Sequence, residues 1–388
     1  MGPGPSDVPA RVLQAMASPT IGHLDPYFLK VMEETQELLR RVFRTQNQLT
    51  IPVSGTGSAG MEACFVNLVE PGDRVLVAVN GVFGTRMCDI VGRLGAELVR
   101  VNAEWGRALD PADVEKAAGS GDLKVLAVVH AETSTGVLQP LKDLSRIARE
   151  AGALFLVDTV TSLGGVEVQT DTWGIDAVYS GTQKCLSCPP GLAPISFGER
   201  ALAALDARAT PVPSWYLDLS MVRDYWGAER KYHHTAPINM IYALREALRL
   251  IDEEGLEARF ARHLRNHRAL VAGVEAMGLT MQVPPGERLP TLNTVRIPDG
   301  ADDAATRRAL LRRFGIEIGG GLGALSGKVW RVGLMGASST ERHVVTFLAA
   351  LQTVLRDQGL KVQSGGLEAA AAVYAEAAER HKREELSQ

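Results

Sequence analysis

The chain has 388 residues, of which 46% are hydrophobic and 22% are charged, and its formal net charge is −4. A mildly acidic chain without a basic run argues against nucleic acid and anionic membrane surfaces as partners. No apolar stretch approaches the roughly 18 residues that span a bilayer, and the first residues do not form a signal peptide. We therefore expect a cytoplasmic protein with about two or three domains.

The N-terminal part predicts an arm followed by a helix. Residues 1–20 are rich in Pro, Ser and Thr and predict an extended arm. Asp25 can cap a helix that begins at Pro26 and runs to Phe43. A short strand over residues 49–53 then enters a glycine-rich turn, which precedes a helix over 61–68.

Strands and helices alternate from residue 74 to residue 184. The expected strands cover residues 74–79, 98–101, 123–130, 153–157 and 175–178, and the expected helices cover 84–94, 111–118 and 141–151. Several of these strands are apolar on both faces, which indicates a parallel sheet covered on two sides. Binding groups gather at the carboxyl ends of such strands, where Thr133, Asp158 and Lys184 stand.

A second, smaller unit begins after an amphipathic helix over residues 239–254. Helices are expected over 257–277, 302–314 and 340–355, and strands over 292–297 and 329–332. From residue 367 the chain is rich in alanine and charge, which predicts a helix on the surface or against a partner. We divide the chain into an arm (1–20), a large domain (21–255), a small α+β domain (256–360) and a helical tail (361–388).

Lys184 is the candidate catalytic residue. It ends the segment Tyr179–Lys184, directly after the predicted strand over 175–178. An unpaired buried ammonium is costly, but a desolvated lysine loses its proton readily and can form a Schiff base with a carbonyl. A lysine that extends from a loop to solvent is the alternative, and this segment alone leaves both open.

The glycines of Gly55-x-Gly57-x-x-Gly60 lie between a predicted strand and a predicted helix and match the dinucleotide motif. That motif requires an acid about 20 residues later, at the end of the next strand. Asn80 stands there instead. We therefore interpret Thr56, Gly57 and Ser58 as a phosphate cradle at a helix N-terminus, with a plain tight turn as the alternative.

Three further residues are candidates for binding. Asp158 ends a buried strand and needs a cationic partner such as a pyridinium nitrogen, unless it is a helix cap. Phe83 could stack on a planar ring, although a lone aromatic residue more often belongs to the core. Arg331 lies on an apolar strand and could bind a substrate carboxylate, or form an interdomain ion pair.

No metal site is expected. Cys185 and Cys188 form a C-x-x-C pair, but no second pair or histidine pair completes a zinc site, so we expect reduced structural thiols. His263 and His267 stand four residues apart on a predicted helix. Because no glutamate-bearing histidine motif is present, we expect them on a solvated helix face.

Together these residues resemble the class V aminotransferases of fold type I, most of all the alanine–glyoxylate and serine–pyruvate aminotransferases. The resemblance extends from residue 2 to about residue 359 and rests on residues 22–26, 130–136, 157–165, 179–184, 232–235, 317–323 and 328–331. It implies an α/β fold with a large domain built on a mainly parallel seven-stranded sheet, and a smaller C-terminal α+β domain. It also implies the cofactor pyridoxal 5'-phosphate.

The resemblance assigns a role to each candidate. Lys184 would carry the cofactor as an aldimine, and Asp158 would pair with its pyridine nitrogen. The implied phosphate ligands are Thr56, Gly57, Ser58 and Gln183, and Phe83, Thr133 and Val160 would also touch the cofactor. Tyr232 and Thr235 would reach the phosphate bound by the partner subunit, which implies an obligatory homodimer. Substrate contacts are implied for Arg331, Gly22 and Thr133.

This chain departs from its relatives at two of these positions. Relatives often have Trp where Phe83 stands and His where Ser58 stands, so cofactor affinity could be weaker here. The tail beyond Gly359 has no counterpart in the core of the family.

The implied reaction is ping-pong transamination between alanine or serine and glyoxylate or pyruvate. Ureidoglycine–glyoxylate and aminoethylphosphonate–pyruvate transamination stay open as alternatives, and an NAD-dependent oxidoreductase is the alternative from another class. Desulfurases need a cysteine on a long mobile loop late in the chain, and none of the four cysteines stands in one.

Overall fold

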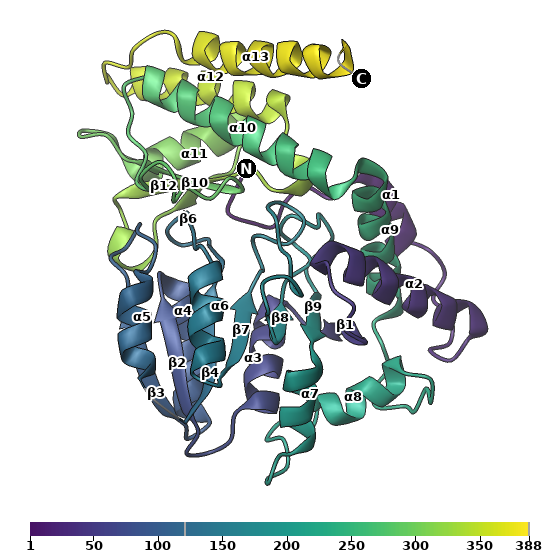
Figure 1. Cartoon of the computed structure of the whole chain (residues 1–388). Coiled ribbons are helices and arrows are strands. Elements are labelled where there is room, and N and C mark those ends of the chain that lie inside the picture. Colours follow the sequence, from purple (N-terminus) through teal and green to yellow (C-terminus); the bar gives the residue numbers. More distant parts are fainter. Residues whose placement is uncertain (120–121, 387–388) are drawn as a thin grey trace.

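The structure is a computed structural model, which describes residues 1–119 and 122–386. A seven-stranded sheet with the order β1-β9-β8-β7-β4-β2-β3 forms its centre (Figure 1). These strands are β1 Leu49–Ser54, β2 Arg74–Val79, β3 Glu97–Asn102, β4 Leu123–Val129, β7 Leu154–Asp158, β8 Ala177–Tyr179 and β9 Leu192–Phe197. The strands from β3 to β8 in this order run parallel, whereas β9 is antiparallel to both of its neighbours. The prediction of a mainly parallel seven-stranded sheet is confirmed.

Helices cover both faces of this sheet, which explains why its central strands are apolar throughout. All five residues of β7 are buried, and so is every residue of β9. The covering helices are α2 Pro26–Phe43, α3 Gly57–Leu68, α4 Val82–Arg93, α5 Pro111–Ala118, α6 Lys142–Glu150, α7 Glu199–Asp206, α8 Leu219–Trp226 and α9 Ile238–Glu254. One continuous apolar core joins them, with members from Val12 to Ile251.

A second apolar core, with members from Ala269 to Ala370, belongs to a smaller unit. Its antiparallel sheet has the order β10-β12-β11, with β10 Leu292–Arg296, β11 Gly319–Gly320 and β12 Val329–Gly333. Its helices are α10 Leu256–Ala276, α11 Asp303–Phe314, α12 Glu341–Asp357, α13 Gly366–Leu386 and the short 3₁₀ turns η1 Gly323–Leu325 and η2 Gly336–Ser338. The two cores favour a division near residue 255, and the boundaries at residues 20, 255 and 360 stay a proposal.

The C-terminal helix α13 packs along α10 of the same chain (Figure 1). Ala370 is completely buried in the second core, and the Tyr374 hydroxyl donates to Asn266 Oδ1 at 2.9 Å. The two backbones approach closely because Gly273 and Gly366 face each other. The helix predicted for the surface or a partner therefore lies against α10, and Gly273, Gly366 and Ala370 make the close approach.

The composition of the arm predicted an extended segment, but the arm is not wholly extended. It contains the helix α1, Ala10–Met16, which packs on α9 and buries Val12 completely. No side chain caps α1, so the local sequence lacks the usual signal of a helix start. The sequence also did not predict the hairpin of β5 (Ala131–Glu132) and β6 (Val137–Leu138), because strands of two residues are too short to show a periodic pattern.

The prediction of a solvated face for His263 and His267 is wrong. The Gly336 N–H group donates to His263 Nε2 at 2.9 Å, and His267 Nδ1 is hydrogen-bonded to Asn293 Oδ1 at 2.6 Å. Burial lowers the pKa of His263 to about 3 and that of His267 to about 4. Both rings are therefore neutral and join α10 to the segments packed against it.

In the part of the chain that the structure describes, no helix combines the length and the apolar character needed to cross a bilayer.

We expect Gly273→Ala to lower the free energy of unfolding by about 1–2 kcal/mol. The added methyl group would overlap Leu348 Cδ1 and lie 2.9 Å from the Gly366 carbonyl oxygen. Gly92→Ala in α4 is the matched control, since nothing lies within 4 Å of a Cβ there. Helix propensity predicts a gain of about 1 kcal/mol for that control. Urea unfolding measures both, and equal stability of the two variants would contradict the close packing of α13.

Candidate active site

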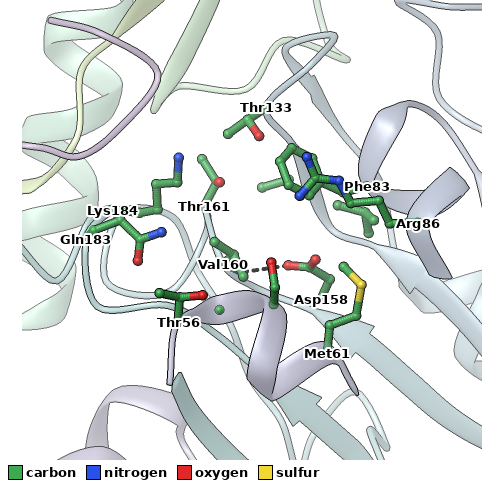
Figure 2. A pocket seen from close by; sticks show the side chains of 14 residues that line it. Thr56, Met61, Phe83, Arg86, Thr133, Asp158, Val160, Thr161, Gln183 and Lys184 are labelled. Atoms are coloured by element: carbon green, nitrogen blue, oxygen red, sulfur yellow. Dashed lines mark hydrogen bonds between the residues drawn. The ribbon is translucent and has the colours of Figure 1, made fainter. Parts of the chain in front are cut away.

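A cavity with an empty volume of about 660 Å³, counted to its open mouth, lies at the carboxyl edge of the parallel strands. Its lining brings together nine of the predicted site residues: Thr56, Gly57, Ser58, Phe83, Thr133, Asp158, Val160, Gln183 and Lys184. In Figure 2, Lys184 and Gln183 lie on one side of the cavity and Phe83 and Arg86 on the other. The sequence missed the other lining residues, namely Met61, Arg86, Val129, Ala131 and Thr161.

One end of the cavity is formed by the N-terminus of α3, where Thr56 precedes Gly57. The Thr56 side chain makes no cap hydrogen bond, so the first N–H groups of α3 can meet a ligand. Glycine at position 57 leaves space here, because a Cβ would make a tight contact of 3.3 Å with Val160 Cγ2 and lie 3.6 Å from Gly181 Cα. A helix N-terminus with exposed N–H groups is suited to a phosphate.

The Gln183 side chain lines the same end. Its amide oxygen is buried and has no hydrogen-bond partner among the described residues. An unpaired buried polar atom is costly, and an amide can exchange its oxygen and nitrogen by rotation. Gln183 is therefore placed to donate a hydrogen bond to an anion bound at α3.

Asp158, the last residue of β7, is 2% exposed and forms the floor of the cavity. Its Oδ1 accepts from the Val160 N–H group at 2.8 Å, and its Oδ2 accepts from the Tyr179 hydroxyl at 2.7 Å. Burial raises the pKa of Asp158 to about 7, although these two hydrogen bonds oppose the rise. A cationic ring nitrogen would hold this carboxylate ionised. Tyr179 was missed, although it stands in the segment that ends at Lys184.

Lys184 is 9% exposed, so the alternative of a lysine reaching into solvent is wrong. Desolvation lowers its pKa to about 8, and the positive charge of Arg331 also acts in this direction. The neutral amine that a nucleophile requires is thus far more abundant near neutral pH than for a lysine with the ordinary pKa of 10.5.

The N-terminal arm covers Lys184, a contact that the sequence did not predict. Lys184 Nζ donates to the Pro3 carbonyl oxygen. Gly4 has φ +99°, and a Cβ there would overlap the lysine side chain, so both backbone and space require glycine. The Ser6 N–H group donates to the Gln183 carbonyl oxygen at 2.8 Å, and the Ser6 hydroxyl donates to that of Lys184 at 2.7 Å.

Phe83 lies in the first turn of α4 and forms the wall opposite Lys184 (Figure 2). The guanidinium of Arg86 lies 4.7 Å from the centre of the Phe83 ring. The sequence signal for Arg86 was its place three residues after Phe83 on one helix, which puts both on one face.

Arg331 does not line the cavity itself but is joined to its wall. It is 8% exposed, its Nε donates to the Gly320 carbonyl oxygen at 2.7 Å, and its Nη1 donates to that of Thr133 at 3.1 Å. No carboxylate forms an ion pair with it among the described residues, so the alternative of an interdomain ion pair is not realised. Its Nη2 lies near Gly319, where a Cβ would be 3.3 Å away.

Gly22, Tyr232 and Thr235 lie apart from the cavity of their own chain. Tyr232 is 55% exposed, its hydroxyl lies 3.3 Å from Thr235 Oγ1, and its ring centre lies 5.1 Å from that of His23. These residues form an exposed group, and one chain alone does not bring them to the other site residues.

The C-x-x-C pair is buried. Burial raises the pKa of the Cys185 thiol to about 11 and that of Cys188 to about 12, and neither forms a disulfide. A buried, protonated thiol is unreactive, which agrees with structural thiols.

Comparison with known proteins identifies the family. The model of a family described as aminotransferase class V matches residues 2–342. The chain belongs to the class V aminotransferases. Among its relatives, the (S)-ureidoglycine–glyoxylate transaminase of Bacillus subtilis is 43% identical over 96% of this chain and 94% of its own. The alanine–glyoxylate aminotransferase of Drosophila melanogaster is 40% identical over 94% of both chains.

Solved structures of class V aminotransferases have the same fold. The ureidoglycine–glyoxylate aminotransferase from Bacillus subtilis has a TM-score of 0.94 at 44% identity, covering 97% of each chain. The alanine–glyoxylate aminotransferase from Nostoc has a TM-score of 0.89 at 51% identity, covering 92% of this chain and 94% of that one. The predictions of fold type I and of pyridoxal phosphate as cofactor are confirmed, and the oxidoreductase interpretation of the glycine motif is wrong.

The residues of the cavity fit this cofactor. The open N-terminus of α3 and the unpaired Gln183 amide suit its phosphate, and the buried Asp158 suits its ring nitrogen. The desolvated Lys184 amine suits its aldehyde.

We expect the rate at which Lys184 captures pyridoxal phosphate to rise with pH and to level off above about 8, the pKa of its amine. Below that pH the ammonium form predominates, which is not nucleophilic. Stopped-flow absorbance between pH 6 and pH 10 measures the midpoint, with Lys184→Ala as the control that shows no covalent band. A midpoint near 10.5, the ordinary lysine value, would contradict the desolvation of this side chain.

Proposed function

We propose that this class V aminotransferase transfers the amino group of a small amino acid, alanine or serine, to a 2-oxo acid, with glyoxylate as the first candidate acceptor and pyruvate as the second. The observation that carries this proposal is the acceptor shared by its relatives. Proteins named for different amino donors, at 43% and 40% identity, are both named for glyoxylate. Alanine is the first candidate donor because a structure 51% identical to this chain is named for alanine and glyoxylate.

The walls near Arg331 favour a short substrate. The Pro3 ring packs against Gly319, where a Cβ would lie 2.8 Å from the ring and 3.3 Å from Arg331 Nη2. The Gly4 backbone closes on Lys184 from the same side. The Pro3 ring thus lies close to Gly319 and the Gly4 backbone lies close to Lys184, which favours a substrate with a small side chain.

Each residue of the site has a separate role in the proposed reaction. Bound pyridoxal phosphate supplies an electron sink that stabilises negative charge at the substrate Cα. Arg331 binds the substrate carboxylate and so selects which Cα bond is aligned for reaction. Lys184 Nζ, with its lowered pKa, accepts and returns the Cα proton. Asp158 keeps the ring nitrogen protonated, and Phe83 and Val160 hold the ring from the cavity walls.

A second donor is favoured by a specific observation. The structure with a TM-score of 0.94 over 97% of both chains is named for ureidoglycine and glyoxylate. (S)-Ureidoglycine is a larger amino donor with a polar ureido group. The exposed guanidinium of Arg86 at the cavity edge is placed to bind such a group.

Half-reaction spectroscopy separates the two donors. We expect L-alanine or L-serine to bleach the visible band of the purified holoenzyme and glyoxylate to restore it. L-Aspartate is the negative control, and freshly generated (S)-ureidoglycine is the competing donor. A bleaching rate at least about tenfold higher with ureidoglycine, a difference in barrier of about 1.4 kcal/mol, would replace the proposal by the second donor. The absence of any response to L-alanine, L-serine and (S)-ureidoglycine would contradict both.

We also propose that the active enzyme is a homodimer in which Tyr232 and Thr235 complete the site of the partner subunit. The exposed group that contains them supports this arrangement. Trp215 is 62% exposed and Tyr216 is 45% exposed, and their rings lie 4.3 Å from that of His233 and 4.8 Å from that of His234. Exposed aromatic residues gathered in one place are typical of an interface.

Subunit mixing tests the shared site. We expect Lys184→Ala and the double variant Tyr232→Ala/Thr235→Ala each to be inactive or strongly impaired. In a mixed dimer one site would then regain every native residue, so random mixing should restore about a quarter of wild-type activity. If the residues act within one chain, mixing restores nothing. Mixing each variant with itself, after the same denaturation and refolding, is the control.

A further inference from the structure

Glu132 is a completely buried carboxylate beside the active site, and the function proposed above assigns it no role. It ends the two-residue strand β5, just beyond the carboxyl end of β4, and none of its surface is exposed. No ion pair neutralises it among the described residues. A buried charge of this kind requires several hydrogen-bond donors.

Its donors come from the start of α4 and from its own hairpin. Glu132 Oε2 accepts from the Phe83 N–H group at 3.1 Å. Glu132 Oε1 accepts from the N–H group of Ser134 at 2.9 Å and from its hydroxyl at 2.6 Å. The Ser134 hydroxyl oxygen in turn accepts from the Val82 N–H group at 2.9 Å. The first turn of α4 is thus capped by residues some 50 positions later in the chain.

No local residue could supply this cap. The residue before α4 is Gly81, which has no side chain and makes no cap hydrogen bond. A Cβ at Gly81 would overlap Glu132 Cγ and Ser134 Oγ, so glycine leaves the space in which the carboxylate reaches the helix. A negative charge at a helix N-terminus is also favourable by itself.

The same carboxylate is linked to three site residues. The backbone N–H group of Phe83 donates to the carboxylate, and the Phe83 ring lines the cavity. Thr133 lies between Glu132 and Ser134, so the bonds within the hairpin fix its backbone, and its carbonyl oxygen accepts from Arg331. Glu132 therefore joins the wall that faces the cofactor ring to the residue proposed to bind the substrate carboxylate.

We propose that Glu132 is a positioning residue: its ionised carboxylate fixes α4 and the β5–β6 hairpin so that Phe83 and Thr133 hold the cofactor ring. This inference rests on the cofactor of the family and not on the identity of the amino donor. Failure of the donor assignment would leave it intact.

Glu132→Gln tests the proposal, because it keeps the shape but loses the charge and turns an amide N–H toward donors. We expect the Kd for pyridoxal phosphate to rise about tenfold, the effect of losing one charge-assisted hydrogen bond. We also expect the induced circular dichroism of the bound cofactor to fall at saturation, because the ring is then held less rigidly. Titration of the full-length chain with pyridoxal phosphate measures both.

Asp176→Asn is the matched control. Asp176 is also a buried carboxylate, 7% exposed, and accepts from the Phe155 N–H group at 2.8 Å, but it lies before β8 at the opposite edge of the sheet. We expect this variant to lose thermal stability while its Kd and induced circular dichroism stay those of the wild type. A Glu132→Gln variant that behaves in the same way would overturn the proposal.

Ser134→Ala keeps the test decisive if Glu132→Gln does not fold. It retains the bond from the Phe83 N–H group to the carboxylate and removes only the hydroxyl that links Glu132 to Val82. We expect a weaker effect, about threefold in Kd, with a measurable loss of induced circular dichroism. Wild-type values for both quantities in a folded Ser134→Ala protein would overturn the proposal.

Discussion

Burial of two opposite charges at one edge of a parallel sheet is the constraint on which the rest of this site depends. Asp158 is 2% exposed and Lys184 is 9% exposed, and desolvation moves the pKa of the acid up to about 7 and that of the amine down to about 8. Both groups therefore titrate near neutral pH without a ligand. In a cofactor with a ring nitrogen, an aldehyde and a phosphate, the ring nitrogen would be a partner for Asp158 and the aldehyde a partner for Lys184. Binding of the cofactor would then offset the electrostatic cost of burying these two groups.

The elements around this edge each present one group to the cavity. The N-terminus of α3 presents N–H groups, α4 presents Phe83, and the hairpin beyond β4 presents Thr133. None of these elements is rigid alone, and long-range contacts join them. Glu132 connects the hairpin to α4, and Arg331 connects the small unit to the hairpin. The site is thus assembled by tertiary contacts between segments that each carry a single functional group.

The N-terminal arm covers the Lys184 side of the cavity. Pro3 and Gly4 lie on the lysine, and Ser6 donates hydrogen bonds to the carbonyl oxygens of Gln183 and Lys184. The Pro3 ring and the Gly4 backbone together narrow the space beside Lys184. This contact supports the proposal of a small substrate and does not depend on the names of the relatives.

Local sequence predicted six of the seven strands of the large sheet, all but β9, and located most of the chemical groups. Apolar periodicity identified the central strands, and the end of each strand located Asp158 and Lys184, because parallel strands present their carboxyl ends at one edge. Only the tertiary structure revealed the fold of the arm over Lys184, the helix α1, the burial of His263 and His267, and the cap that Glu132 supplies to α4. These features arise between residues far apart in the chain, and neither propensity nor spacing encodes such contacts. For Tyr232 and Thr235 the tertiary structure of one chain is not enough either, because the folded single chain leaves them outside the cavity.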